Sequence, residues 1–229
     1  MINKIINKKL TVDNVLFCDS KKMGDLLQFL NQFTENRHLI TKIKRKKLIK
    51  NPLNTAVIYR QYHLDSANYQ AELTKIYHDS IRNQLVLINA TKYHLANRLF
   101  RCGIHCSDKK SITDQRKFRQ LAIRYQNTKR IVSFSCHSLA SLIKASKNLF
   151  IDIIFISPVF ATTSHNHEKT IPLLQLRKFM IKNRQMQIIN NNIFALGGID
   201  FRNIKSISKS GFVGFGGIDI FIKSLQKLQ

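Results

Sequence analysis

Two kinds of hydrophobic pattern alternate along the chain. Short runs rich in β-branched and aromatic residues are typical of β-strands, and apolar residues that recur every three or four positions are typical of amphipathic helices. Strands are therefore predicted at residues 14–18, 55–62, 84–88, 102–105, 131–135, 152–157, 193–196 and 212–215. Helices are predicted at residues 24–33, 68–82, 93–100, 113–125, 139–146, 171–184 and 218–228. A further helix is predicted through Ile204 and Ile207, with Asp200 as its N-cap. The alternation of strand and helix indicates an α/β protein with parallel strands.

Polar residues and glycines mark the ends of the predicted strands. The strand at residues 152–157 is apolar on both faces, which is typical of a parallel strand that is covered on both sides. Strand ends carry Arg60, Asn89, His105, His137, Ser157, Gly197 and Gly216. A barrel brings such ends into one ring, whereas the competing doubly wound open sheet spreads them along a line. We therefore predict a single (β/α)8 TIM barrel with its site at this ring.

The length of the chain, 229 residues, fits one domain better than two. Within it, residues 1–54 are predicted to hold the first strand and helix followed by a basic connection, and residues 55–229 the remainder of the barrel. The connection, from Thr34 to Leu53, has weak periodicity and fits either an extra helix or a surface loop.

The composition is strongly basic, with a formal net charge of +25. Such a charge can indicate a nucleic-acid or anionic-membrane partner, but the lysines lie along the whole length. A solvated basic surface is preferred, and a nucleic-acid binder with basic and aromatic residues gathered on one face is the alternative. No apolar run approaches the ~20 residues of a membrane span, and the first residues, MINKIINKKL, do not resemble a secretory signal. A soluble, cytoplasmic protein is expected, with a homo-oligomer left open.

The cysteines are scattered along the chain. Cys18, Cys102, Cys106 and Cys136 form no disulfide framework, so reduced thiols are the simplest interpretation. The short spacing from Cys102 to Cys106 does not match a zinc site, and His105 between them is predicted to be a packing or hydrogen-bonding residue.

Two glycine pairs follow the last two predicted strands. Gly197-Gly198 and Gly216-Gly217 each precede a predicted helix. Glycine amides can turn toward an anion at a helix N-terminus because no Cβ is in the way. In barrels, the loops after the seventh and eighth strands are a frequent phosphate site. The two pairs therefore predict phosphate binding, although glycine also serves in tight turns.

Seven short sequence motifs follow one another along most of the chain. They are AVIYRQY at 56–62, VLINA at 86–90, GIHCSD at 103–108, SCHS at 135–138, SPVFATTSH at 157–165, ALGGID at 195–200 and GFVGFGGI at 211–218. Together they resemble the thiamine phosphate synthase/TenI family. The resemblance implies an enzyme of thiamine biosynthesis that joins a thiazole phosphate to hydroxymethylpyrimidine pyrophosphate. Its partners are then these two small phosphorylated substrates.

The same resemblance implies roles for individual residues. Cations around the leaving pyrophosphate stabilise its developing charge, which is the role implied for Arg60 and for Mg2+ near Asp108. The residues implied to bind substrate and phosphate are Asn89, Ser157, Thr162, Ser164, His165, Gly197, Gly198, Gly216 and Gly217. Two positions depart from the family pattern, because Ala90 replaces an aspartate and His165 replaces a lysine. Since loss of a carboxylate weakens a hard-cation site, only a weakened Mg2+ site is expected.

The motif SCHS at residues 135–138 leaves a second activity open. In the TenI branch its histidine, here His137, is implied to be the acid and base of a thiazole tautomerase, with Ser135 beside it. Imidazole suits proton transfer because its pKa lies near neutral pH. A third alternative is a barrel that binds a phosphate ligand without catalysis. His165 and His167 are a weaker metal candidate, because two surface histidines in a loop are more common than a site.

Overall fold

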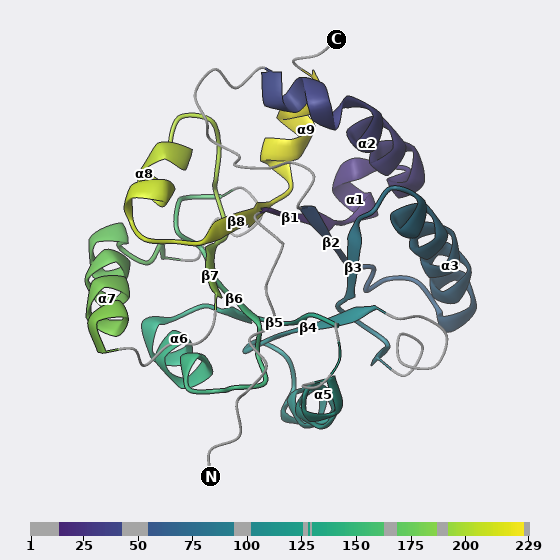
Figure 1. Ribbon diagram of the computed structural model, residues 1–229. Helices are drawn as coiled ribbons and strands as arrows, with labels where there is room; N and C mark the ends of the chain where they lie inside the picture. The colour runs from purple at the N-terminus through teal and green to yellow at the C-terminus, as the bar shows by residue number, and fades with distance from the viewer. Residues whose placement is uncertain are drawn as a thin grey trace.

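The computed structural model describes residues 14–42, 55–93, 102–125, 128, 130–162, 169–186 and 192–226. In this part of the chain, eight parallel strands form a closed barrel in sequence order (Figure 1). The strands are β1 Asn14–Cys18, β2 Thr55–Tyr59, β3 Val86–Asn89, β4 Gly103–Ser107, β5 Val132–Cys136, β6 Ile153–Ile156, β7 Asn192–Ala195 and β8 Gly214–Gly217. The predicted TIM barrel is confirmed.

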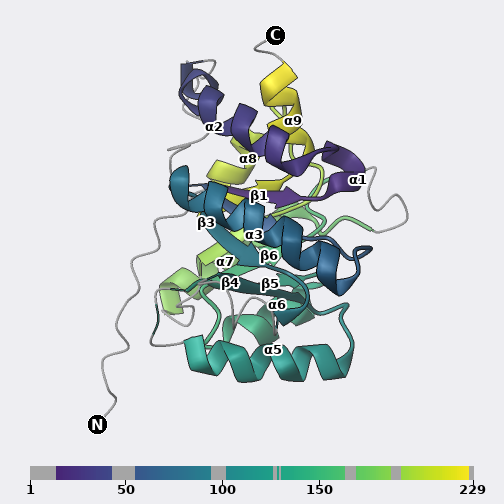
Figure 2. The same cartoon turned by 90° about the vertical axis from the view of Figure 1, so that its right-hand side faces the viewer.

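Helices surround the barrel on its outside (Figures 1 and 2). Those described are α1 Ser20–Met23, α2 Leu26–Lys42, α3 Ser66–Arg82, α5 Ile112–Tyr125, α6 Leu139–Ser146, α7 Leu173–Met186, α8 Ile204–Lys209 and α9 Asp219–Gln226. Side-chain caps fix several of their starts: Asp65 accepts a hydrogen bond from the Asn68 amide at 2.9 Å, which begins α3. Among the described helices, none is long and apolar enough to cross a membrane.

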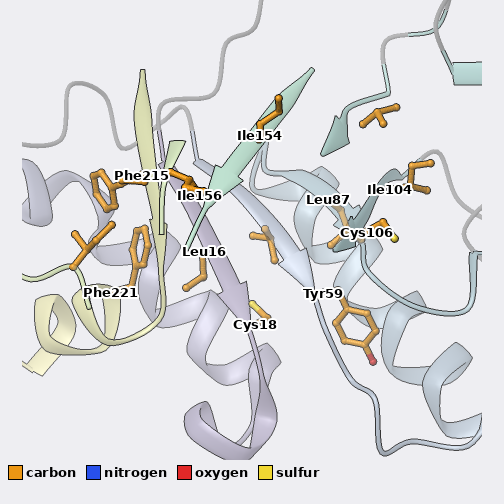
Figure 3. Close-up of a cluster of buried hydrophobic side chains, with 14 of the residues drawn as sticks. Leu16, Cys18, Tyr59, Leu87, Ile104, Cys106, Ile154, Ile156, Phe215 and Phe221 are labelled. Carbon is orange, nitrogen blue, oxygen red and sulfur yellow. The ribbon is translucent and has the colours of Figure 1, made fainter. Parts of the chain in front are cut away.

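Alternate residues of each strand belong to two apolar layers. Along β1, Val15 and Phe17 face the barrel interior, whereas Leu16 and Cys18 pack between strands and helices. Figure 3 shows part of this outer layer, where Phe215 of β8 stacks on Phe221 of α9 with ring centroids 6.1 Å apart. The two layers fix the strands rigidly, so that the residues just beyond their carboxyl ends are held in a ring.

The structure corrects several predicted boundaries. Helix α2 continues beyond Phe33 to Lys42, so the first part of the predicted connection is helical. Strand β8 includes Gly216 and Gly217, which were predicted to follow it, because it pairs with β1 as well as β7 and closes the barrel. Asn203, not Asp200, is the N-cap residue of α8. Residues 43–54 and most of the predicted helix at 93–100 lie outside the described residues.

All four cysteines are buried and free of disulfides. Burial raises the pKa of the Cys102 and Cys136 thiols to about 12. A thiol with so high a pKa is a poor nucleophile at neutral pH, because the thiolate is the reactive form. Cys136, although next to His137, is therefore a core residue and not part of a thiol catalyst.

Candidate active site

A small pocket of about 70 Å3 lies where the carboxyl ends of β1, β2, β6, β7 and β8 converge. The predicted site residues that line it are Arg60, Ser157, Thr162, Gly197, Gly198 and Gly217. They come from segments far apart in sequence, which the barrel gathers at one rim. Its size suits a phosphate group rather than a whole substrate.

Gly197 and Gly198 form the wall of this pocket. Both have positive φ angles, 89° and 62°, a region that L side chains rarely adopt. A Cβ on Gly198 would lie 2.2 Å from the carbonyl oxygen of Ala161, so the loop after β6 packs directly on this glycine. Helix α8 begins only at Ile204. The predicted helix N-terminus is therefore not adjacent to this glycine pair.

Gly216 and Gly217 have different surroundings. A Cβ on Gly216 would lie 2.8 Å from Phe17 and 3.0 Å from Phe155, so this residue makes room for the rings inside the barrel. Gly217 lines the pocket and comes just before α9. Only the second glycine of this pair is thus at the rim, and the phosphate role of Gly216 stays a prediction.

Arg60 is the main cation of the pocket. Its Nη2 donates to Asp19 at 3.2 Å, and its guanidinium lies over the Phe17 ring at 5.6 Å. In the described part of the chain, Nε of Arg60 is buried without a hydrogen-bond partner. An unpaired buried donor of this kind is expected to find a ligand or water acceptor.

Two further charged residues line the pocket that the sequence patterns did not single out. Lys22 of α1 lies 3.8 Å from Asp219, which is in the first turn of α9. Asp19, the partner of Arg60, was not singled out either. These carboxylates partly offset the positive charge that an anion would meet.

Asp108 and His137 form a close pair at the ends of β4 and β5. Nδ1 of His137 lies 2.5 Å from Oδ1 of Asp108, and the His137 backbone amide donates to Oδ2 at 2.8 Å. Partial burial opposes ionisation of Asp108, but hydrogen bonds from His137 and Ser141 outweigh it and lower the pKa of Asp108 to about 2. The carboxylate is therefore ionised and accepts from Nδ1, which leaves Nε2 of His137 to exchange protons.

The two serines of the SCHS motif form hydrogen bonds with other residues than His137. Ser138 accepts from the Ser141 amide at 3.1 Å and is the N-cap of α6. Ser135 faces the barrel interior, where its hydroxyl lies 3.1 Å from Nε2 of His105. Ser135 therefore contacts His105 and not His137.

His105 is a buried, neutral core residue, as predicted. Its Nδ1 lies 2.9 Å from the Ser133 hydroxyl, and its ring packs edge-on against Phe17 and Phe155. Burial, with the charge of Arg60 as a smaller cause, lowers the pKa of His105 to about 3. The imidazole and the serine hydroxyls thus satisfy each other inside the barrel.

Mild acid should destabilise the protein through His105. The folded chain keeps this histidine neutral down to a pKa of about 3, whereas the unfolded chain protonates it near pH 6.5. Below pH 6.5 the unfolded state therefore binds more protons, and the free energy of unfolding should fall by about 2 kcal/mol from pH 7 to pH 5. Denaturant unfolding measured between pH 5 and pH 7 gives the slope of the free energy of unfolding against pH.

Two variants isolate the histidine that is responsible. His105→Gln should flatten the slope, because glutamine has no proton to gain. His78→Gln, at an exposed position on α3, should leave the slope unchanged. Equal slopes for the wild type and both variants would contradict this assignment.

Comparisons with known proteins show the family of the chain. The family model described as thiamine monophosphate synthase matches residues 33–219. The chain belongs to the thiamine monophosphate synthase family. It is 32% identical over 139 residues to the "Putative thiamine-phosphate synthase 2" of Aquifex aeolicus (strain VF5), across 61% of this chain and 67% of that protein. It is 28% identical over 85 residues to a thiamine-phosphate synthase of Latilactobacillus sakei subsp. sakei (strain 23K), across 37% of this chain and 35% of that protein.

A solved structure of similar fold carries a related name. The thiamine phosphate pyrophosphorylase from Pyrococcus furiosus superposes with a TM-score of 0.68 at 14% sequence identity, covering 96% of this chain and 94% of that one. At this identity the likeness concerns the barrel fold alone.

The described residues do not form the metal site that this family membership implies. Both oxygens of Asp108 are engaged by His137, and the buried amide of Asn89 contacts Tyr69 and Thr91. Ala90 is 2% exposed and packs in the inner apolar layer. Among the described residues, no three His, Cys, Asp or Glu side chains are grouped to hold a metal. A hard cation such as Mg2+, which needs several oxygen ligands, does not fit this donor set.

The Mg2+ affinity of the protein alone should accordingly be low. We expect calorimetry to give a dissociation constant above about 1 mM without pyrophosphate, because too few oxygens are available. Ala90→Asp adds the missing carboxylate and should tighten binding. Ala161→Asp, which adds a carboxylate to the exposed loop after β6, is the matched control and should not. Micromolar binding by the unmodified protein would contradict this prediction.

Some predicted site residues cannot be placed. Ser164, His165 and His167 lie outside the described residues. Their roles, like those of the residues at the rim, stay predictions.

Proposed function

We propose that this member of the thiamine monophosphate synthase family binds a phosphorylated thiazole at the barrel mouth and moves a proton on it. The observation that carries the proposal is the Asp108–His137 pair, with 2.5 Å between Oδ1 and Nδ1. A carboxylate in this position orients the imidazole through Nδ1, so that Nε2 can face a substrate. His137 is then the acid and base of a tautomerase reaction on the thiazole carboxylate phosphate.

The small pocket supports binding of the substrate phosphate. Arg60 supplies positive charge, and its Nε has no hydrogen-bond partner among the described residues. Ser157 and Thr162 bring hydroxyls to the same pocket. The backbone at Gly197 and Gly198 can approach a bound phosphate closely because neither residue has a Cβ. A guanidinium with hydroxyls and backbone amides is a common set of phosphate ligands.

Coupling of thiazole phosphate to hydroxymethylpyrimidine pyrophosphate is the second candidate. The names of the relatives favour it, and so does the position of Arg60, which can hold a leaving pyrophosphate. Ala90 and the engaged Asp108 oppose it, because they remove oxygen ligands for a metal ion. Proton transfer needs no such ligands, and this favours tautomerisation over coupling.

Assays of both reactions on the wild-type protein test the proposal. We expect tautomerisation of the thiazole carboxylate phosphate, and we expect coupling to be slow or absent at millimolar Mg2+. If the protein is expressed in a thiamine auxotroph that lacks its own coupling enzyme and restores growth, coupling would become the first candidate and tautomerisation the second. Binding of thiazole phosphate with neither activity would identify a barrel that has kept only its phosphate pocket.

A further inference from the structure

A second cavity, of about 840 Å3, lies outside the barrel between α5 and α6. These two helices are neighbours on the outer ring in Figure 1. The cavity shares no lining residue with the small pocket at the mouth. Its volume falls in the range of roughly 300–1,000 Å3 that is typical of small-molecule sites. We call it the α5/α6 groove.

The floor of the α5/α6 groove is apolar and partly aromatic. Phe134 on the outer face of β5 is only half-buried, and its ring lies 5.8 Å from that of Phe118, tilted by 42°. Ala122, Ala145 and Ile151 complete the floor. At the rim, Ile112 is 72% exposed. The other floor residues are themselves buried. The apolar surface that a ligand can cover is therefore that of Phe134 and Ile112, and covering it gains about 25 cal/mol per Å2.

The rim of the α5/α6 groove is basic. Arg116 and Arg119 of α5 and Lys144 of α6 line it. In the described part of the chain, none of these three side chains takes part in an ion pair. The carboxylate that lines the groove, Asp108, is already engaged by His137. The groove therefore offers positive charge that the described residues do not neutralise.

The arrangement of these charges favours phosphate. Arg116 and Arg119 are three residues apart on one helix, so both side chains lie on the same face of α5. A guanidinium presents a planar fork that binds phosphate oxygens in pairs. A flat apolar floor beside two such forks matches a molecule with an aromatic ring at one end and phosphates at the other.

We propose that the α5/α6 groove binds a nucleoside diphosphate. The aromatic ring lies on Phe134, which Phe118 supports from below, and the phosphates lie between Arg116, Arg119 and Lys144. Asp108 and His137 also line the groove, so the bound molecule comes close to the candidate acid and base. This site does not depend on which reaction occurs at the mouth.

Calorimetric titration of the full chain with ADP tests the site. ADP should bind saturably, and more tightly than adenosine or inorganic pyrophosphate alone, because each of these fills only part of the groove. The double variant Arg116→Gln/Arg119→Gln should weaken ADP binding by at least about tenfold. Ala140→Trp, which places a large ring at the α6 edge of the groove, should also weaken it.

The matched control removes the same charge elsewhere. Arg82 on α3 and Arg177 on α7 are exposed and do not line the groove, so Arg82→Gln/Arg177→Gln should keep the affinity within about twofold. Equal weakening by both double variants would overturn the proposal, because it would indicate non-specific attraction. Absence of saturable ADP binding, unchanged binding in Ala140→Trp, or equally tight binding of pyrophosphate would overturn it too. Binding of an acidic peptide in place of ADP would assign the groove to a protein partner.

Discussion

Replacing His137 with alanine should lower the rate of thiazole tautomerisation by roughly 10^2- to 10^4-fold. The imidazole is the group that Asp108 orients and whose Nε2 is left to exchange protons. Arg60→Ala should act mainly on KM, because Arg60 lines the small pocket proposed to bind phosphate, and neither Asp108 nor His137 lines that pocket. Measuring kcat and KM for both variants separates the two roles.

The order of effects reverses if coupling is the reaction. Arg60→Ala should then cost at least about 100-fold in kcat, since the guanidinium stabilises the charge of the departing pyrophosphate. His137→Ala should be milder. His78→Ala, at an exposed position on α3, is the control and should change neither reaction. A tautomerase that keeps its full rate in His137→Ala would rule out the proposed acid and base.

Gly198→Ala should abolish phosphate binding and destabilise the fold by about 3 kcal/mol or more. The added Cβ would lie 2.2 Å from the Ala161 carbonyl oxygen and 2.6 Å from that of Phe160. Both are backbone atoms, so the loop after β6 must move away from the pocket. Thermal unfolding and titration with phosphate measure the two losses.

Gly24→Ala separates this steric effect from backbone strain. Gly24 also has a positive φ, 68°, but a Cβ there would meet nothing within 4 Å. Its substitution should cost only the conformational penalty, about 1–2 kcal/mol, and should leave phosphate binding intact. Similar losses for the two variants would mean that the packing of the loop on Gly198 contributes little.

The barrel was predictable from sequence because its strands are short apolar runs bounded by polar residues. The predicted ends of β8 and α2 were wrong because these ends depend on contacts that the local sequence pattern does not show. Glycines are poor strand formers, yet Gly216 lies in β8 because pairing with β1 closes the sheet. Helix α2 continues past Phe33 to Lys42: the next residue, Thr34, is buried, and its hydroxyl donates to the carbonyl oxygen of Leu30 at 2.9 Å. Local propensity contains neither the strand pairing nor the burial of Thr34.

The ring of site residues was predictable for the same reason as the strands. Arg60, Ser157 and Gly197 follow strand ends, and a barrel places such residues at one rim. The partners of these residues were not predictable, since they depend on side-chain geometry across neighbouring strands. Asp108 and His137 meet because β4 and β5 pair with Ser107 opposite Ser135. From the resemblance alone, Asp108 was taken as a metal ligand.

The double hold of Asp108 on His137 has a consequence for stereochemistry. The ring nitrogen and the backbone amide of one residue are fastened to the two oxygens of one carboxylate, so the imidazole cannot turn over between two half-reactions. In the proposed tautomerisation, a single nitrogen then both removes and returns the proton, from one side of the substrate ring. The migrating hydrogen stays on that face, and part of an isotopic label should travel with it instead of washing out into water.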